Sequence, residues 1–230
     1  MFQGFDPRVV DFMWGIRFNN ERTWFEAHKE EYLTYFYRPM QELCRQAYAA
    51  VAEENQDLGL ISRLTRIYRD ARRLHGRGPY KDSLWFAIEQ PGDGFWFSVP
   101  SLWFELSPEG WSYGLGYFAP PAAIMARFRA RLDRDPKSFE KIVRALSKRE
   151  DLVLGGEEYK RPKGAAPTKL LSPWYNRKGF ILSCSRPNEG ELFTPALYDT
   201  LVDAYRALIP LYRYLATLPG DPDPRENVVI

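Results

Sequence analysis

The chain has 230 residues, of which 45% are hydrophobic and 16% are aromatic. This composition supplies enough apolar side chains for a folded core and argues against intrinsic disorder. The 32 Lys and Arg residues nearly balance the 30 Asp and Glu residues, and the net charge is +2. A globally basic nucleic-acid signature is therefore excluded, and any anion binding must come from local clusters of cations.

Cysteine, histidine and hydropathy narrow the class of protein further. Cys44 and Cys184 are expected to be buried free thiols, because residues 1–4 show no signal peptide that would imply an oxidising compartment. No apolar run approaches the roughly 20 residues of a membrane span, and the presence of only two histidines argues against a His-based metal site. We therefore expect a cytoplasmic protein with no membrane contact, no metal and no cofactor.

Residues 6–54 are predicted to be helical. Asp6 followed by proline resembles an N-cap, and Asn20 can cap a second helix. Aromatic residues at three- and four-residue spacing give this second helix a broad apolar face, which we interpret as core rather than as a ligand platform. Pro39 should break or kink it, because proline lacks the amide donor and crowds the preceding turn.

The pattern changes to short strands over the sheet region, residues 64–118. Apolar and aromatic runs alternate here with Gly/Pro turn signals, and their short spacing favours an antiparallel meander over parallel βαβ units. The strands are expected at residues 64–68, 83–89, 95–99, 102–106 and 111–117.

Helices return within residues 120–148, and each begins at a proline. A basic loop and a further strand follow within residues 155–187, and the strand at 178–185 is expected to join the same sheet. The last helix is predicted at residues 195–217, with a kink at Pro210.

These elements together predict a single α+β domain over residues 1–218. Its central, mostly antiparallel sheet is flanked by N-terminal, middle and C-terminal helices. The remaining residues, 219–230, are rich in Pro, Gly and Asp and should form a loosely ordered tail.

The most informative stretch is basic and lies between two apolar, strand-like segments. A Gly-x-Gly-Pro-Tyr-Lys turn at residues 76–81 connects the two segments. Arginine binds phosphate or carboxylate through two parallel hydrogen bonds, and a glycine-rich turn lets backbone amides approach an oxyanion. The cations of this stretch are Arg66, Arg69, Arg72, Arg73, Arg77 and Lys81.

Two interpretations of this stretch stay open. If the first strand ends near Asp70, the turn could gather Arg69, Arg72 and Lys81 around one anion. Alternatively, Asp70 and Asp82 pair with the cations and only hold a solvated hairpin together.

A second basic loop contains Lys160, Arg161 and Lys163, with a proline that restricts its backbone. Such a loop is more often solvated surface. If it lies beside the first cluster, however, the repulsion between the two sets of cations favours a bound anion.

The carboxylates are less informative. Glu89 and Glu105 lie on or beside apolar strands, where an inward-facing carboxyl needs a partner and has a shifted pKa. Their spacing does not define an acid–base pair, and the nucleophile, Walker-type and dinucleotide-binding signatures are absent. No catalytic residue is assigned, and whether the protein is an enzyme stays open.

Several ordered motifs resemble one family. Residues 19–25 match an Asn-Asn-x-x-x-Trp-Phe opening, residues 69–72 and 78–81 resemble an Arg-Asp-x-Arg … Pro-Tyr-Lys core, and residues 160–164 resemble a later basic Pro-Lys-Gly loop. Together they resemble the family called domain of unknown function 2461, over about residues 5–215. Residues 73–77 depart from the family pattern. The resemblance implies a widespread, mostly bacterial, soluble protein and brings no established activity.

The resulting hypothesis is an uncharacterised protein that binds an anionic, phosphate- or carboxylate-bearing small molecule. Asp70, Tyr80 and Trp85 would support the site, either as walls or, for Asp70, in a reaction. Alternatives are a nucleic-acid-binding module, against which the near-neutral charge weighs, and a structural or interaction protein with purely structural cations. The anion-binding residues would be Arg69, Arg72, Lys81, Lys160, Arg161 and Lys163.

Overall fold

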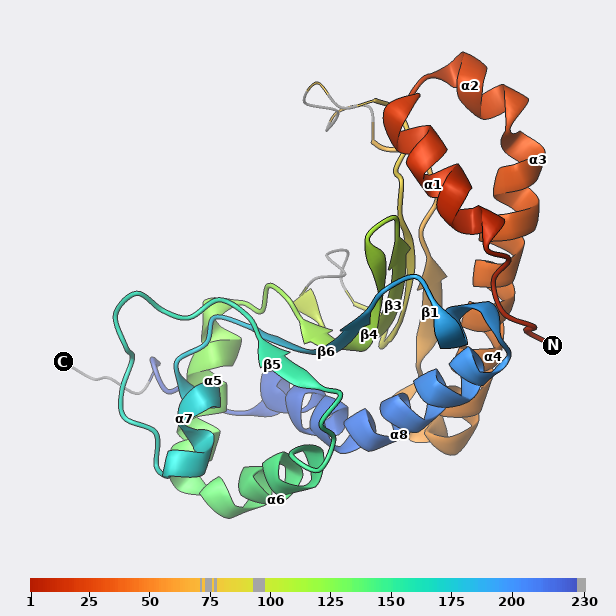
Figure 1. The fold of residues 1–230 in the computed structure, drawn as a ribbon. Coiled ribbons are helices and arrows are strands. Elements are labelled where there is room, and N and C mark those ends of the chain that lie inside the picture. Colours follow the sequence, from red (N-terminus) through yellow and green to blue (C-terminus); the bar gives the residue numbers. More distant parts are fainter. Residues whose placement is uncertain (71, 73–75, 77, 93–97, 227–230) are drawn as a thin grey trace. The chain divides into compact units, whose positions relative to one another are not determined.

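The computed structural model describes residues 1–70, 72, 76, 78–92 and 98–226 (Figure 1). Arg73 and Arg77, and most of the strand predicted at residues 95–99, lie outside this part. The chain forms two compact units. Unit 1 consists of Met1–Ile88, Trp103–Tyr113 and Ser185–Ala204, and unit 2 consists of Glu89–Leu102, Gly114–Cys184 and Tyr205–Ile230.

A six-stranded antiparallel sheet contributes residues to both units and confirms the predicted α+β class. Its strand order is β1-β2-β3-β4-β6-β5, so the first four strands form the predicted meander. The outer strand β5 pairs antiparallel with β6, and Val153 lies opposite Ser183. The strands are β1 (Ile61–Leu64), β2 (Leu84–Glu89), β3 (Ser101–Ser107), β4 (Gly110–Tyr117), β5 (Val153–Gly155) and β6 (Phe180–Arg186).

Two strand predictions need correction. The strand expected at residues 64–68 ends at Leu64, because the Thr65 hydroxyl replaces a backbone carbonyl as the acceptor for Trp85 N, at 3.1 Å, and so ends the ladder. Beyond it, Tyr68 forms only an isolated bridge with Tyr80. β5 lies where an irregular region was expected to begin, since three residues are too few to show a period.

Helices flank the sheet in sequence as predicted, and α8 continues through Pro210. No helix in the described part of the chain is long and apolar enough to cross a membrane. The N-terminal elements are α1 (Arg8–Phe18), α2 (Arg22–Ala27), α3 (Lys29–Glu31), the π-helical η1 (Tyr32–Tyr37) and α4 (Arg38–Glu54). The others are α5 (Ala122–Arg134), α6 (Pro136–Leu146), α7 (Ser172–Tyr175) and α8 (Ala196–Ala216), with short 3-10 turns at Gln56–Leu58, Lys169–Leu171, Gly190–Phe193 and Leu218–Gly220.

The break predicted at Pro39 takes the form of a change in helix type. Arg38 N donates to Leu33 O, five residues back, which is the π-helical pattern of η1. Pro39 then occupies the first turn of α4, where its missing amide needs no partner.

Strand alternation gives the sheet two chemically different faces in unit 1. One face is apolar and fully buried, and it includes Leu84, Phe86, Phe104, Leu106, Trp111 and Tyr113. The other face carries half-buried Trp85, Trp103, Glu105 and Ser112. This second face supplies Glu105, one of the carboxylates of the site described below.

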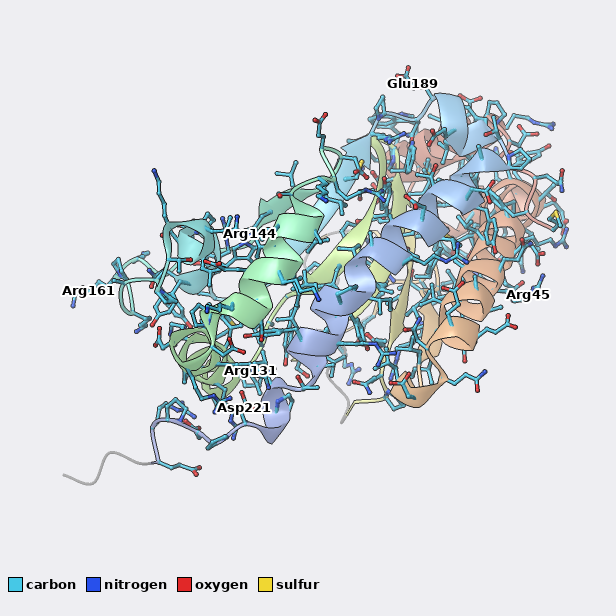
Figure 2. All side chains as sticks on the ribbon, turned by 90° about the horizontal axis from the view of Figure 1, so that it is seen from below. Arg45, Arg131, Arg144, Arg161, Glu189 and Asp221 are labelled. Atoms are coloured by element: carbon cyan, nitrogen blue, oxygen red, sulfur yellow. The ribbon has the colours of Figure 1, made fainter. Side chains whose placement is uncertain are left out.

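The described part of the expected tail makes defined contacts within unit 2. Arg131 of α5 donates through Nε to Asp221 Oδ2 at 2.6 Å, and both residues are labelled in Figure 2. Asp223 is buried and pairs with Arg225 at 2.6 Å. Residues 227–230 lie outside the described part of the chain.

Gly114 on β4 lies so close to β6 that a side chain does not fit. A Cβ at Gly114 would lie 2.1 Å from Leu182 O, whereas a Cβ at Gly155 on the outer strand β5 would meet nothing closer than 3.5 Å. We expect Gly114→Ala to lower the free energy of unfolding by about 2 kcal/mol or more, through overpacking. Gly155→Ala should change it by less than about 0.5 kcal/mol. Urea denaturation measures both, and equal effects would contradict the close approach.

Candidate functional site

The basic turn between β1 and β2 is held by the side chain of Asn20. Asn20 Nδ2 donates to Tyr80 O at 2.9 Å, and Tyr80 N donates to Asn20 Oδ1 at 2.9 Å. The expectation that Asn20 caps a helix is therefore wrong: α2 begins after Glu21 and has no side-chain cap. A carboxamide carries both a donor and an acceptor, so it pairs with the backbone of Tyr80 as a neighbouring strand would.

The turn leaves room for this amide pair only because residue 78 is glycine. A Cβ at Gly78 would lie 2.2 Å from Asn20 Oδ1. The Tyr80 ring is 3% exposed and stacks on Phe25 with 4.3 Å between ring centroids. Tyr80 therefore supports the turn by packing against α2, and its ring does not form the exposed wall that the sequence suggested.

Arg69 is half-buried and tied to the same carbonyl. Its Nε donates to Tyr80 O at 2.7 Å, so this oxygen accepts hydrogen bonds from both Arg69 and Asn20. Arg69 Nη2 lies 3.9 Å from Asp82 Oδ1, a long ion pair. Arg69 thus holds the turn, and its terminal nitrogens have no closer acceptor among the described residues.

Lys81 lies in a locally positive environment. Its Nζ donates to Arg66 O at 2.9 Å. Burial lowers the pKa of Lys81 below its ordinary value, and the positive charges of Arg69 and Arg66 lower that pKa further. No carboxylate in the described part of the chain is among the groups that act on it. A bound anion would relieve this repulsion.

Arg72 lies apart from these groups at the surface. Its side chain is 89% exposed, and its Nε and Nη2 donate to the two carboxylate oxygens of Asp70 at 3.0 and 2.9 Å. The structure therefore brings together Arg66, Arg69 and Lys81, and it pairs Arg72 with Asp70. Trp85 lies half-buried on β2.

Of three carboxylates near the turn, two share one arginine. Arg17 of α1 donates through Nε to Asp82, and through Nη1 and Nη2 to Glu109. Glu105 on β3 has no ion pair among the described residues and accepts a hydrogen bond from Ser83. Arg17 therefore neutralises Asp82 and Glu109, whereas Glu105 has no cationic partner in the described part of the chain.

The pKa of the Glu105 carboxyl is accordingly raised. Burial is the largest cause, the hydrogen bond from Ser83 partly offsets it, and the negative charges of Asp82 and Glu109 raise the pKa further. The sequence analysis predicted a shifted pKa for Glu105 and Glu89 if their carboxyls faced inwards. Glu89 is 1% exposed and accepts a hydrogen bond from Ser101 Oγ at 2.8 Å.

A second asparagine holds the second basic loop, which belongs to unit 2. Lys163 N donates to Asn176 Oδ1 at 2.7 Å, and Asn176 Nδ2 donates to Gly164 O at 3.0 Å. Tyr159 N donates to Asn176 O at 2.9 Å. Both basic motifs are thus fixed by the same device, a carboxamide that pairs with peptide groups of the loop.

The side chains of the second loop are exposed. Figure 2 shows Arg161 extending away from the chain. Lys163 Nζ lies 5.0 Å from the centroid of the Tyr159 ring, and the Arg129 guanidinium lies 5.5 Å from it. Among the described residues, Lys160, Arg161 and Lys163 form no ion pair.

The chain thus combines two asparagine-clamped basic motifs with an α+β fold. The chain belongs to the family described as conserved hypothetical protein DUF2461, whose sequence profile matches residues 8–214. This match covers both basic motifs and confirms the resemblance seen in the sequence. The comparison with curated proteins gave no match.

The Asn20 pair can be tested against its neighbour in sequence. Asn20→Ala removes two hydrogen bonds from partly buried backbone groups, so we expect the free energy of unfolding to fall by about 2 kcal/mol. Asn19 makes one exposed hydrogen bond, from Nδ2 to Gly15 O at 3.0 Å. Asn19→Ala should cost less than about 1 kcal/mol in the same denaturation experiment. A smaller loss for Asn20→Ala than for Asn19→Ala would contradict the clamp.

The charge of Glu105 should make stability depend on pH. Because its folded pKa is raised above the ordinary 4.5, the folded state binds more protons, and the contribution of Glu105 to stability falls as pH rises from about 4.5 through the folded pKa. Glu105→Gln should therefore unfold at higher urea than the wild type at pH 8, and the difference should vanish near pH 4.

Glu109 provides the control of opposite sign. The hydrogen bond from Arg17 lowers the pKa of Glu109, so its stabilising contribution is present above the ordinary pKa and is lost as pH falls through the folded pKa. Glu109→Gln should lower stability at pH 8. If the stability of Glu105→Gln depended on pH in the same way as that of Glu109→Gln, the charge of Glu105 would not destabilise the folded state.

Proposed function

We propose that this chain binds an anionic small molecule, one that carries a phosphate or carboxylate group, at the basic turn of unit 1. The observation that carries the proposal is the meeting of Arg66, Arg69 and Lys81 at one turn, with no carboxylate acting on the Lys81 ammonium. An oxyanion within reach of Arg69 and Lys81 would replace cation–cation repulsion with charge-assisted hydrogen bonds.

The hydrogen bonds that hold the backbone of Tyr80 and Lys81 support a small and specific ligand. Asn20 and Arg69 both bind Tyr80 O, and Lys81 N donates to Ile67 O at 2.7 Å across the turn. Cations on a fixed backbone lose less conformational freedom when they bind a ligand.

The second basic loop provides an alternative function. Lys160, Arg161 and Lys163 are exposed and form no ion pair in the described part of the chain, next to the aromatic ring of Tyr159. Exposed cations beside an aromatic ring are suited to an extended polyanion such as single-stranded nucleic acid. We further propose a cytoplasmic location, which the two buried free thiols, Cys44 and Cys184, support.

A thermal-shift screen in phosphate-free buffer tests the proposal. It should include phosphate, sulfate, nucleotides, sugar phosphates, dicarboxylates and short oligonucleotides. A ligand present at 100 times its Kd stabilises the folded state by about 2.7 kcal/mol, which raises Tm. We expect one class of small anion to raise Tm selectively, and isothermal titration calorimetry then gives its Kd.

The variants Lys81→Met and Arg72→Ala form a matched pair for this titration. Lys81→Met keeps the aliphatic stem and removes one charge-assisted hydrogen bond, so the affinity should fall at least about tenfold. Arg72→Ala should leave the affinity unchanged, because Arg72 is exposed and bound to Asp70. A loss only in Lys160→Ala or Arg161→Ala would place the site on the second loop. No shift with any small anion would leave the cations of unit 1 structural.

A further inference from the structure

A groove opens between β1, at the end of the sheet, and the helix α4 that packs beside it in unit 1. In the strand order of the described residues, β1 has β2 as its one neighbour. The groove has a volume of about 770 Å³. Its lining includes Ser62 and Leu64 from the strand, and Tyr37, Arg38, Cys44 and Tyr48 from the helical side.

The backbone of β1 directs hydrogen-bonding groups away from β2 at two of these residues. Thr65 N donates to Trp85 O at 2.9 Å, so residue 65 faces β2. Residues along an antiparallel edge alternate between facing the neighbour and facing outwards. Ser62 and Leu64 therefore direct their amide and carbonyl groups outwards, away from β2. Consistent with this alternation, Leu60 O accepts from Tyr48 Oη at 3.0 Å.

An extended peptide fits these groups best. Pairing with both Ser62 and Leu64 would satisfy up to four backbone hydrogen-bonding groups and add a strand to the sheet, a common mode of peptide recognition. Tyr37 and Tyr48 line the groove and offer aromatic surface to the side chains of such a peptide.

The charges of the groove select an acidic occupant. Arg38 is exposed and has no ion pair among the described residues, whereas Arg45 pairs with Glu42 at 2.7 Å. A second copy of β1 is disfavoured, because the register that uses both outward residues pairs Ser62 with Leu64 and places Arg63 opposite its own copy. Like charges directly opposite each other destabilise a strand pair.

We propose that this groove is a docking site for an extended acidic peptide segment of a partner protein, which pairs with the edge of β1 and places a carboxylate against Arg38. The site is separate from the basic turn, and its test does not depend on the function proposed above.

A display library of random eight-residue peptides, selected on the full chain, provides the probes. The enriched sequences should alternate β-branched or aromatic residues with polar ones and contain Asp or Glu. Two N-methylated versions of a selected peptide form a matched pair in fluorescence anisotropy. Methylation of the amides that face β1 should abolish binding, whereas methylation of the opposite edge should not. Equal binding of the two versions, or enrichment of basic sequences, would overturn the proposal.

Protein variants test the same contacts from the other side. Ser62→Pro removes an outward amide, and proline is tolerated on an edge strand where the missing amide faces away from the ladder. We expect about a tenfold loss of peptide affinity for Ser62→Pro, and little change for Ser62→Ala, which keeps the amide.

Charge variants complete the test. Arg38→Gln should weaken binding about fivefold and flatten its salt dependence, because it removes one charge pair. Arg144→Gln on α6 (Figure 2), an exposed arginine of unit 2, should have no effect. Lys81→Met should also retain full peptide affinity, which distinguishes this site from the basic turn. If Ser62→Pro does not fold, the two N-methylated peptides still test whether the peptide pairs with the edge of β1. Unchanged affinity in folded Ser62→Pro would overturn the proposal.

Discussion

The pairing of the Asn20 carboxamide with the peptide groups of Tyr80 is the interaction on which the candidate site depends. A basic turn alone would be a solvated loop whose cations repel one another. Here both backbone groups of Tyr80 are engaged from the N-terminal helical region, and the same carbonyl also orients Arg69. Residue 78 must be glycine, because the Asn20 carboxamide occupies the space that a Cβ at residue 78 would need. Asn176 repeats this arrangement in unit 2.

The charged residues around the turn divide into two groups according to their partners. Arg17 has carboxylate partners and connects α1 to Asp82, just before β2, and to the β3–β4 hairpin, so its charge serves the fold. Lys81 and Glu105 are half-buried, and each lies beside charges of its own sign. The low polarity that makes these positions costly is also what would strengthen a hydrogen bond to a ligand. Charged groups that lower the stability of the folded state are expected at ligand-binding sites.

The sheet in unit 1 separates structural and functional roles by geometry. Its apolar face is buried, its polar face carries Glu105, and β1 has β2 as its one neighbour in the strand order of the described residues. Thr65 lies between β1 and the basic turn. Its hydroxyl accepts a hydrogen bond from Trp85 N, and β1 ends there. The two sites proposed above therefore lie outside the buried apolar face of this sheet.

The sequence by itself determined the α+β class, the meander and most helices, because hydrophobic period and Gly/Pro turns are local signals. It also identified the basic motifs and Glu105, a carboxyl whose pKa is raised by burial. Only the tertiary structure decided which cations have partners. Asn20 and Tyr80 are 60 residues apart, and Arg17 and Glu109 are 92 apart, so no local pattern predicts that they pair. Residue type sets what a side chain can bind, whereas the path of the chain sets what lies within its reach.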